Sequence, residues 1–101
     1  DEGVEWYVPA RRLCELVAEV ADLDVMTINP GIATAADWQR VAYKGGSETG
    51  VLNFTTHLAG RDGSQTCVVM TINDDTAISA TTPTSIYASI LAALAPPREE
   101  E

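Results

Sequence analysis

The clearest indication of the fold lies in residues 40–73, which read RVAYKGGSETGVLNFTTHLAGRDGSQTCVVMTIN. Within residues 50–59 one set of alternate positions forms a mostly apolar face, and those positions are Leu52, Phe54, Thr56 and Leu58. A period of two predicts a β-strand with one buried face. Residues 40–44 predict an earlier strand, which leads into a pair of glycines.

The third segment of this stretch, residues 65–73, is apolar at successive positions. Such a run predicts a strand that is covered on both faces, which is typical of a central strand. The residues between the second and third segments, 60–63, read Gly-Arg-Asp-Gly and predict a hairpin loop. The expected unit is therefore a three-stranded antiparallel meander.

Helical spacing appears on both sides of this meander. Residues 9–22 begin with Pro9, which suits a first helical position. Their apolar positions follow the helical repeat, with Cys14 beside them, at Leu13, Leu16, Val17, Val20 and Ala21. A final helix is predicted from Pro83 to about Ala95. Its expected buried stripe, bordered by Tyr87, consists of Ile86, Ile90, Leu91 and Leu94.

These elements predict an α+β fold with an N-terminal helix, a three-stranded antiparallel meander and a C-terminal helix packed on the sheet. Asn29-Pro30-Gly31 predicts a turn, and Thr34 is expected to cap a short helical turn over residues 35–39 that carries Trp38. We expect a single domain over residues 9–95, preceded by a lead-in of residues 1–8. The acidic tail, residues 96–101, is expected to be disordered.

Composition limits the class of partner. The chain has 101 residues, of which 46% are hydrophobic and 21% charged, as in an ordinary globular domain. Its net charge of −9 argues against nucleic acid or an anionic membrane as the main partner. No apolar run approaches the ~18–20 residues of a membrane span, so no membrane insertion is expected. The chain begins with Asp1 rather than Met, and we expect further residues upstream of it.

The sequence offers few candidates for metal or covalent chemistry. The two cysteines, Cys14 and Cys67, could pair if the protein is exported, but two thiols do not make a disulfide framework, so the sequence leaves their pairing open. One histidine and two cysteines at unrelated spacings cannot supply four zinc ligands. We therefore predict no metal and no cofactor.

The sharpest local signal is Tyr43-Lys44-Gly45-Gly46-Ser47, followed by residues 50–53, Gly-Val-Leu-Asn. It resembles the K-T-G strand of penicillin-binding proteins and class A β-lactamases. Residues 5–7 and 12–14, the Asn29-Pro30-Gly31 turn and Trp38 resemble β-lactamase-like serine hydrolases of the actinobacterial type. The hairpin and the closing helix are similar to the last two sheet strands and the C-terminal helix of that fold. The resemblance covers roughly residues 4–95 and implies the last third of a complete enzyme.

The resemblance implies a substrate-binding role for four residues. Lys44 would place a fixed positive charge at the substrate carboxylate. Gly46 would let the substrate backbone lie close to the strand, and the backbone N–H of Ser47 would be an oxyanion-hole donor. Gly45 departs from the family, because the usual Thr or Ser there gives the carboxylate a hydroxyl hydrogen bond. Ser47 is a candidate replacement if the strand is shifted.

The motifs that would carry the nucleophile are absent. Lys44 is the only lysine, so an S-x-x-K motif would need serine at position 41, which is Val41. No serine or tyrosine is followed two residues later by asparagine, so neither S-x-N nor Y-x-N is present. We therefore assign no catalytic residue in this chain and expect no activity from it alone. An esterase built on His57 as base, with Asp62 or Ser64 nearby in sequence, is disfavoured.

Two hypotheses follow. In the first, the chain is the C-terminal portion of a β-lactamase/transpeptidase-like serine hydrolase, and it pairs with an upstream segment of that hydrolase or with itself. The resemblance then implies a peptidoglycan-type peptide as substrate and an extracytoplasmic or secreted location. In the second, the chain is a non-catalytic module that binds a peptide or carboxylate at the open strand edge of residues 41–47, with Lys44 holding a terminal carboxylate.

Overall fold

The computed structural model describes residues 9–48, 50–74, 76 and 78–95. The elements follow one another as α1 (Ala10–Val20), the short 3₁₀ helices η1 (Asp24–Thr27) and η2 (Ala35–Asp37), β1 (Arg40–Glu48), β2 (Val51–Ala59), β3 (Gln65–Asn73) and α2 (Thr81–Leu94). The three strands form one sheet in the order β1-β2-β3, and both pairs are antiparallel. The predicted α+β fold, helix–meander–helix, is confirmed.

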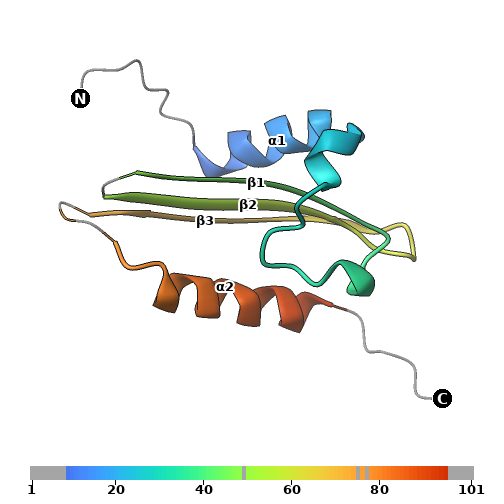
Figure 1. Cartoon of the computed structure of the whole chain (residues 1–101). Coiled ribbons are helices and arrows are strands. Elements are labelled where there is room, and N and C mark those ends of the chain that lie inside the picture. The colour runs from blue at the N-terminus through green and yellow to red at the C-terminus, as the bar shows by residue number, and fades with distance from the viewer. Residues whose placement is uncertain (1–8, 49, 75, 77, 96–101) are drawn as a thin grey trace.

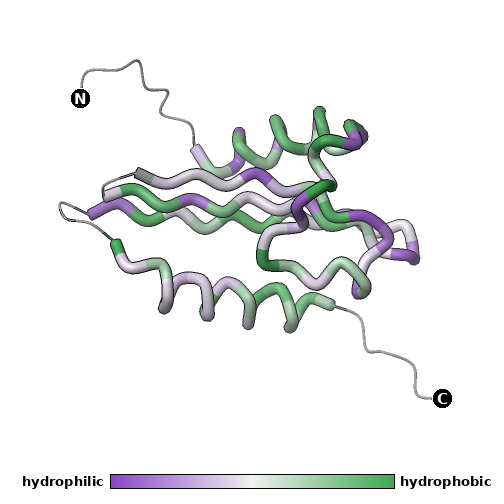
Figure 2. Tube along the Cα trace, in the orientation of Figure 1, coloured by the Kyte–Doolittle hydropathy of each residue, from purple (hydrophilic) through white to green (hydrophobic). Residues whose placement is uncertain are grey.

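The sheet lies between the two helices, with α1 on one face and α2 on the other (Figure 1). Alternation along the strands assigns each residue to a face, and apolar and polar positions alternate along much of the sheet (Figure 2). In β2 the predicted apolar face, Leu52, Phe54, Thr56 and Leu58, is buried. It points toward α2.

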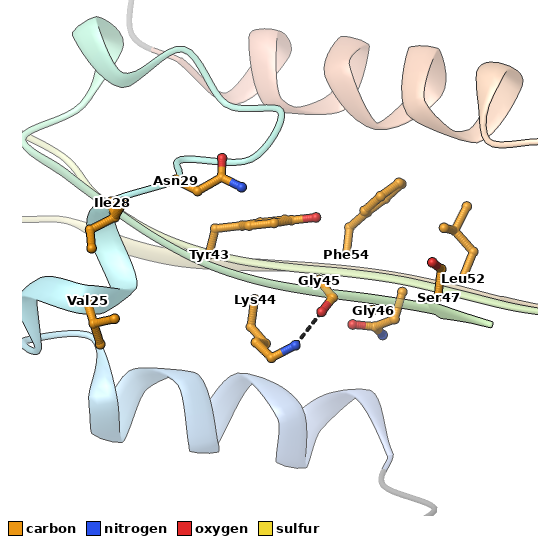
Figure 3. Close-up of a pocket in the computed structure, with 11 residues that line it drawn as sticks. Val25, Ile28, Asn29, Tyr43, Lys44, Gly45, Gly46, Ser47, Leu52 and Phe54 are labelled. Atoms are coloured by element: carbon orange, nitrogen blue, oxygen red, sulfur yellow. Dashed lines mark hydrogen bonds between the residues drawn. The ribbon is translucent and has the colours of Figure 1, made fainter.

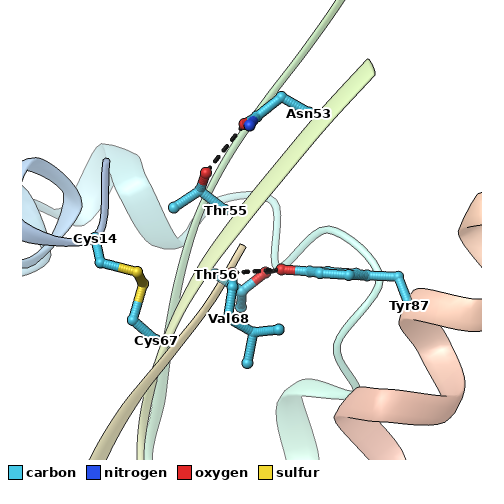
Figure 4. The surroundings of a disulfide bond; sticks show 7 residues. All are labelled: Cys14, Asn53, Thr55, Thr56, Cys67, Val68 and Tyr87. Carbon is cyan, nitrogen blue, oxygen red and sulfur yellow. Dashed lines mark hydrogen bonds between the residues drawn. A yellow bond between two sulfur atoms is a disulfide. The ribbon is translucent and has the colours of Figure 1, made fainter. Parts of the chain in front are cut away.

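The core on the α2 face is built from large side chains. Leu58 and Tyr87 have no exposed surface, and the Phe54 and Tyr87 rings pack with their centroids 5.0 Å apart. The Tyr87 hydroxyl lies 2.7 Å from the Thr56 hydroxyl and donates to the Val68 carbonyl at 2.8 Å (Figure 4). This buried hydroxyl is therefore fully paired, as a buried polar group must be to avoid a desolvation cost.

The core on the α1 face is smaller. Its buried members are Val17, Ala21 and Ala42. A disulfide joins Cys14 of α1 to Cys67 of β3, with 5.8 Å between the Cα atoms (Figure 4). The Arg40 guanidinium donates to the carbonyl of Ala21 at 2.8 Å and satisfies a backbone acceptor just beyond the end of α1. The pairing that the sequence left open is thus a cross-link between helix and sheet.

The third strand has the predicted range, but its predicted central position is wrong. β2 is the central strand, and β3 is an edge strand. Both faces of β3 are nevertheless partly covered, because Cys67 is tied to α1 on one face and Tyr87 bonds the Val68 carbonyl on the other. An apolar run indicates that both faces of a strand are covered. It does not indicate whether the strand has a neighbour on one edge or on both.

The buried stripe predicted for the final helix is also partly wrong. Tyr87 and Leu91 are the buried residues of α2, whereas Ile86 and Ile90 remain 50% and 39% exposed. Leu94 is 44% exposed. In the part of the chain that the structure describes, the sheet has three strands, and it covers one line of the helix rather than the full stripe.

Other sequence predictions differ from the structure at element ends. β1 continues through Gly45 and Gly46 to Glu48 instead of ending at the glycines, because both residues pair with β2. α1 ends at Val20, and Thr34 makes no side-chain cap to η2. The predicted lead-in of residues 1–8 and the tail of residues 96–101 lie outside the described residues.

Candidate functional site

A pocket of about 530 Å³ lies at the outer edge of β1 (Figure 3). All of the substrate-binding residues predicted from the sequence, Lys44, Gly45, Gly46 and Ser47, line it. The other lining residues are Val25, Ile28, Asn29, Tyr43, Leu52, Asn53 and Phe54. The pocket therefore includes side chains from both faces of the sheet, gathered around the edge strand.

The backbone of β1 directs toward this pocket hydrogen-bonding groups that its pairing with β2 does not use. The Asp74 N–H donates to the Gly50 carbonyl at 2.8 Å, and the Gly60 N–H donates to the Ser64 carbonyl at 2.8 Å. Since hydrogen-bonded pairs alternate along an antiparallel ladder, even-numbered residues of β2 bond to β3 and odd-numbered ones bond to β1. The register then directs the N–H and C=O groups of Tyr43, Gly45 and Ser47 away from β2. Among the described residues no further strand pairs with this edge, which is therefore open to another strand.

The single lysine of the chain stands at this open edge. Lys44 is exposed, and its side chain leaves β1 on the α1 side of the sheet (Figure 3). Its Nζ donates to the carbonyl oxygen of the next residue, Gly45. That carbonyl is one of the groups directed away from β2, so the ammonium lies beside the free backbone edge.

On the other side of the sheet the Tyr43 ring is packed between two glycines. A Cβ atom at Gly31 would lie 2.5 Å from Tyr43 Cδ1, and a Cβ atom at Gly45 would overlap the Tyr43 hydroxyl. Gly31 has a φ of +70°, a backbone conformation that favours glycine, and its N–H donates to Asn29 Oδ1 at 2.8 Å. Partial burial of the phenol raises the pKa of Tyr43 above its usual value.

Open space and a polar pair lie next to the lysine on the α1 face. A Cβ atom at Gly46 would meet nothing within 4 Å. Gly46 pairs with Asn53 across the ladder, and Asn53 Oδ1 accepts a 3.0 Å hydrogen bond from the Thr55 hydroxyl. The carbonyl of the Asn53 amide is thereby engaged. Its NH₂ group is a donor on the same face as Lys44.

η1 and its contribution to the site were not predicted from the sequence. Its first turn is fixed by the Met26 N–H donating to the Leu23 carbonyl at 3.0 Å. The exposed fractions of two lining residues, Val25 and Ile28, are 66% and 78%. Exposed aliphatic side chains beside an open strand edge provide apolar contact for a ligand. The irregular spacing of these residues along the chain carries no helical or strand signal.

The structure does not assemble the disfavoured esterase site at the pocket. His57 pairs across the sheet with Cys67 and Ala42, and it is not among the residues that line the pocket. Asp62 Oδ1 accepts hydrogen bonds from the hydroxyl and the N–H of Ser64, at 2.7 and 3.0 Å, within the β2–β3 hairpin. These bonds hold the pKa of the Asp62 carboxyl below its usual value.

Within the described ranges, no three His, Cys, Asp or Glu side chains are grouped so that they could hold a metal ion. Among those same residues no helix combines the length and the apolar character needed to cross a membrane. Comparison with protein-family models, with curated proteins and with solved structures found no match to this chain.

Proposed function

We propose that this chain provides the substrate-binding strand of a β-lactamase/transpeptidase-like serine hydrolase, whose nucleophile is carried by another segment. One observation carries the proposal: the open edge of β1 holds an exposed lysine against its free backbone groups. Addition of an extended peptide to a free sheet edge is a common mode of peptide recognition. The K-x-G sequence at this edge supplies the resemblance to the hydrolase family.

In the proposed complex, a peptide pairs with the outward backbone groups of Tyr43, Gly45 and Ser47. The Lys44 ammonium then donates to the peptide carboxylate instead of to the Gly45 carbonyl. The carboxylate is charged and is therefore the stronger acceptor. The empty space at Gly46 leaves room for the peptide backbone. The N–H of Ser47, one of the outward groups, is then the oxyanion donor of the assembled enzyme.

The opposite edge of the sheet supports the part of the proposal that requires another segment. The outer edge of β3 has no neighbouring strand among the described residues. On α2, Ala88 and Ala92 line a second pocket together with Trp38, which precedes β1. Ile86 and Ile90 lie on the opposite flank of that helix, which we assign to the side of β3. An added strand at β3 would cover both isoleucines.

A second candidate function uses the same β1 edge without any partner segment. In this function the chain is a stand-alone module that binds peptides with a terminal carboxylate. The core of the described chain supports this function, because it is buried without help from another segment. Buried clusters lie on both faces of the sheet, and none of the described residues has a buried side-chain polar atom without a partner. This module would retain Lys44 for ligand binding and would have no catalytic step.

The test of the shared binding edge is a titration of the 101-residue chain with an N-acylated D-Ala-D-Ala peptide, followed by two-dimensional amide NMR. We expect shifts concentrated at residues 43–47, and Lys44→Ala should weaken binding by about tenfold or more because a charged hydrogen bond is lost. Lys44→Arg keeps the charge and should lose less. Arg12→Ala, an exposed cation on α1, is the matched control. Shifts that avoid residues 43–47 would reject both functions.

The two functions are separated by the behaviour of the free chain. If another segment normally covers the outer edge of β3 and the exposed isoleucines of α2, the free chain should self-associate or bind an apolar dye. The double variant Ile86→Lys/Ile90→Lys should reduce that association without changing peptide affinity. A monomer that binds no dye would reject the hydrolase portion and leave the stand-alone module.

A further inference from the structure

Position 45 lacks the hydroxyl that the K-T-G pattern supplies, and the structure places another hydroxyl there. The Tyr43 ring extends along β1 so that its oxygen occupies the space where a side chain at Gly45 would begin. A larger residue at position 45 and a tyrosine in this orientation exclude each other. The glycine is therefore part of the arrangement that positions the phenol.

The Tyr43 hydroxyl is free to bind a ligand. No hydrogen bond joins it to any other residue that the structure describes, and it is not a buried atom left without a partner. Tyr87, the other described tyrosine of the α2 face, instead uses its hydroxyl on Thr56 and Val68 within the core. The contrast indicates that the Tyr43 oxygen is available at the pocket, which Tyr43 lines.

The phenol and the lysine flank one residue from opposite sides of the sheet. Lys44 Nζ is held at the carbonyl oxygen of Gly45, and the Tyr43 oxygen lies next to the Cα of the same residue (Figure 3). The outward edge of Gly45 lies between them. A ligand paired with that edge meets the ammonium on its α1 side and the phenol on its α2 side.

We propose that the Tyr43 hydroxyl donates a hydrogen bond to the carboxylate of the ligand bound at Lys44, and so replaces the hydroxyl missing at position 45. The inference rests on the proposed binding function of the β1 edge. It makes Tyr43 a specificity-determining residue that favours a carboxylate over an uncharged amide. A phenol, with its usual pKa of 10.0, carries its proton at neutral pH and can donate, and partial burial raises the pKa of Tyr43 further.

The experiment compares the N-acylated D-Ala-D-Ala peptide with its C-terminal amide, each titrated into the 101-residue chain. Tyr43→Phe keeps the ring between Gly31 and Gly45 and removes only the oxygen. We expect it to weaken binding of the carboxylate peptide by about tenfold and binding of the amide by less than about twofold. Ser47→Ala removes the other candidate hydroxyl and tests whether Ser47 is the donor instead. Arg12→Ala, at an exposed cation of α1 that does not line the pocket, should change neither affinity. Melting temperatures should confirm that these variants stay folded.

A rescue variant makes the test specific for the hydroxyl. Tyr43→Leu alone should lose the preference for the carboxylate, and adding Gly45→Ser in that background should restore part of it, since the space at position 45 is then open. If Lys44→Ala weakens binding but Tyr43→Phe does not, the inference is wrong and the binding function stands. If Ser47→Ala reproduces the loss instead, Ser47 is the donor and the inference is also wrong. If the unmodified chain binds neither peptide, both proposals fail.

Discussion

The α2 face of the sheet is closed by large interlocking side chains, whereas the α1 face is closed by small residues and a disulfide. On the first face Leu58, Phe54 and Tyr87 bury extensive apolar surface. On the second face the buried cluster contains only Val17, Ala21 and Ala42, and the Cys14–Cys67 bond attaches the helix. The comparison indicates that hydrophobic burial holds α2 in place and that a covalent link compensates for the smaller core under α1.

The same difference bears on the candidate site. Lys44 and the open space at Gly46 lie on the α1 face, beside the smaller core. Tyr43 lies on the α2 face, where its ring packs between two glycines next to the larger core. The proposed site therefore combines an exposed cation on one face with a firmly packed phenol on the other.

A substitution in the core of the α2 face is expected to change the free energy of unfolding most. Leu58→Ala should lower the free energy of unfolding by about 4 kcal/mol, because Leu58 has no exposed surface and its neighbours cannot collapse into the space. Val17→Ala on the α1 face removes fewer buried atoms and should cost about half as much. Urea denaturation of both variants measures the difference. Equal losses would show that the two cores are equally important.

The next effect concerns the disulfide of the α1 face. Cys14 and Cys67 are 53 residues apart, and closing a loop of this length restricts the unfolded chain enough to stabilise the fold by up to about 4 kcal/mol. The double variant Cys14→Ser/Cys67→Ser should lose about 3 kcal/mol, and reduction of the unmodified chain should have a similar effect. A reducing agent should leave the double variant unchanged. No loss in either experiment would contradict the role assigned to the cross-link.

The smallest effect is the pH dependence of the free energy of unfolding that arises from Tyr87, the buried phenol on the α2 face. Burial raises the pKa of Tyr87 from 10.0 to about 12. The folded state thus holds the proton more tightly than the unfolded state, so the stabilisation is complete below pH 10 and is lost as the pH rises toward about 12. Tyr87→Phe should cost about 1–2 kcal/mol at neutral pH, since its hydrogen bonds are lost. It should also flatten this part of the stability curve, measured by denaturation at pH 9 to 12.

The alternation of β2 and the helical spacing of the two flanking segments predicted the fold class correctly. The range of β3 was also predicted, but its place at the edge was not, because a strand covered by helices on both faces has the same apolar pattern as a central strand. The exposure of Ile86 and Ile90 was missed for a related reason. Helical spacing shows which residues share a stripe, and the width of the sheet decides how much of that stripe is covered.

Some features of the candidate site were likewise predicted from the sequence, and others were not. The sequence alone predicted that Lys44 ends a strand and is followed by two glycines, because these residue types and their spacing are local properties of the chain. The second hypothesis had already placed residues 41–47 at an open strand edge, and β1 is an edge strand of the described sheet. The sequence did not show that η1 brings Val25 and Ile28 beside this strand, or that the Tyr43 oxygen fills the space at Gly45. Both features depend on how side chains pack in three dimensions, including the packing of the Tyr43 ring against Gly31, and such packing leaves no periodic signal in the sequence.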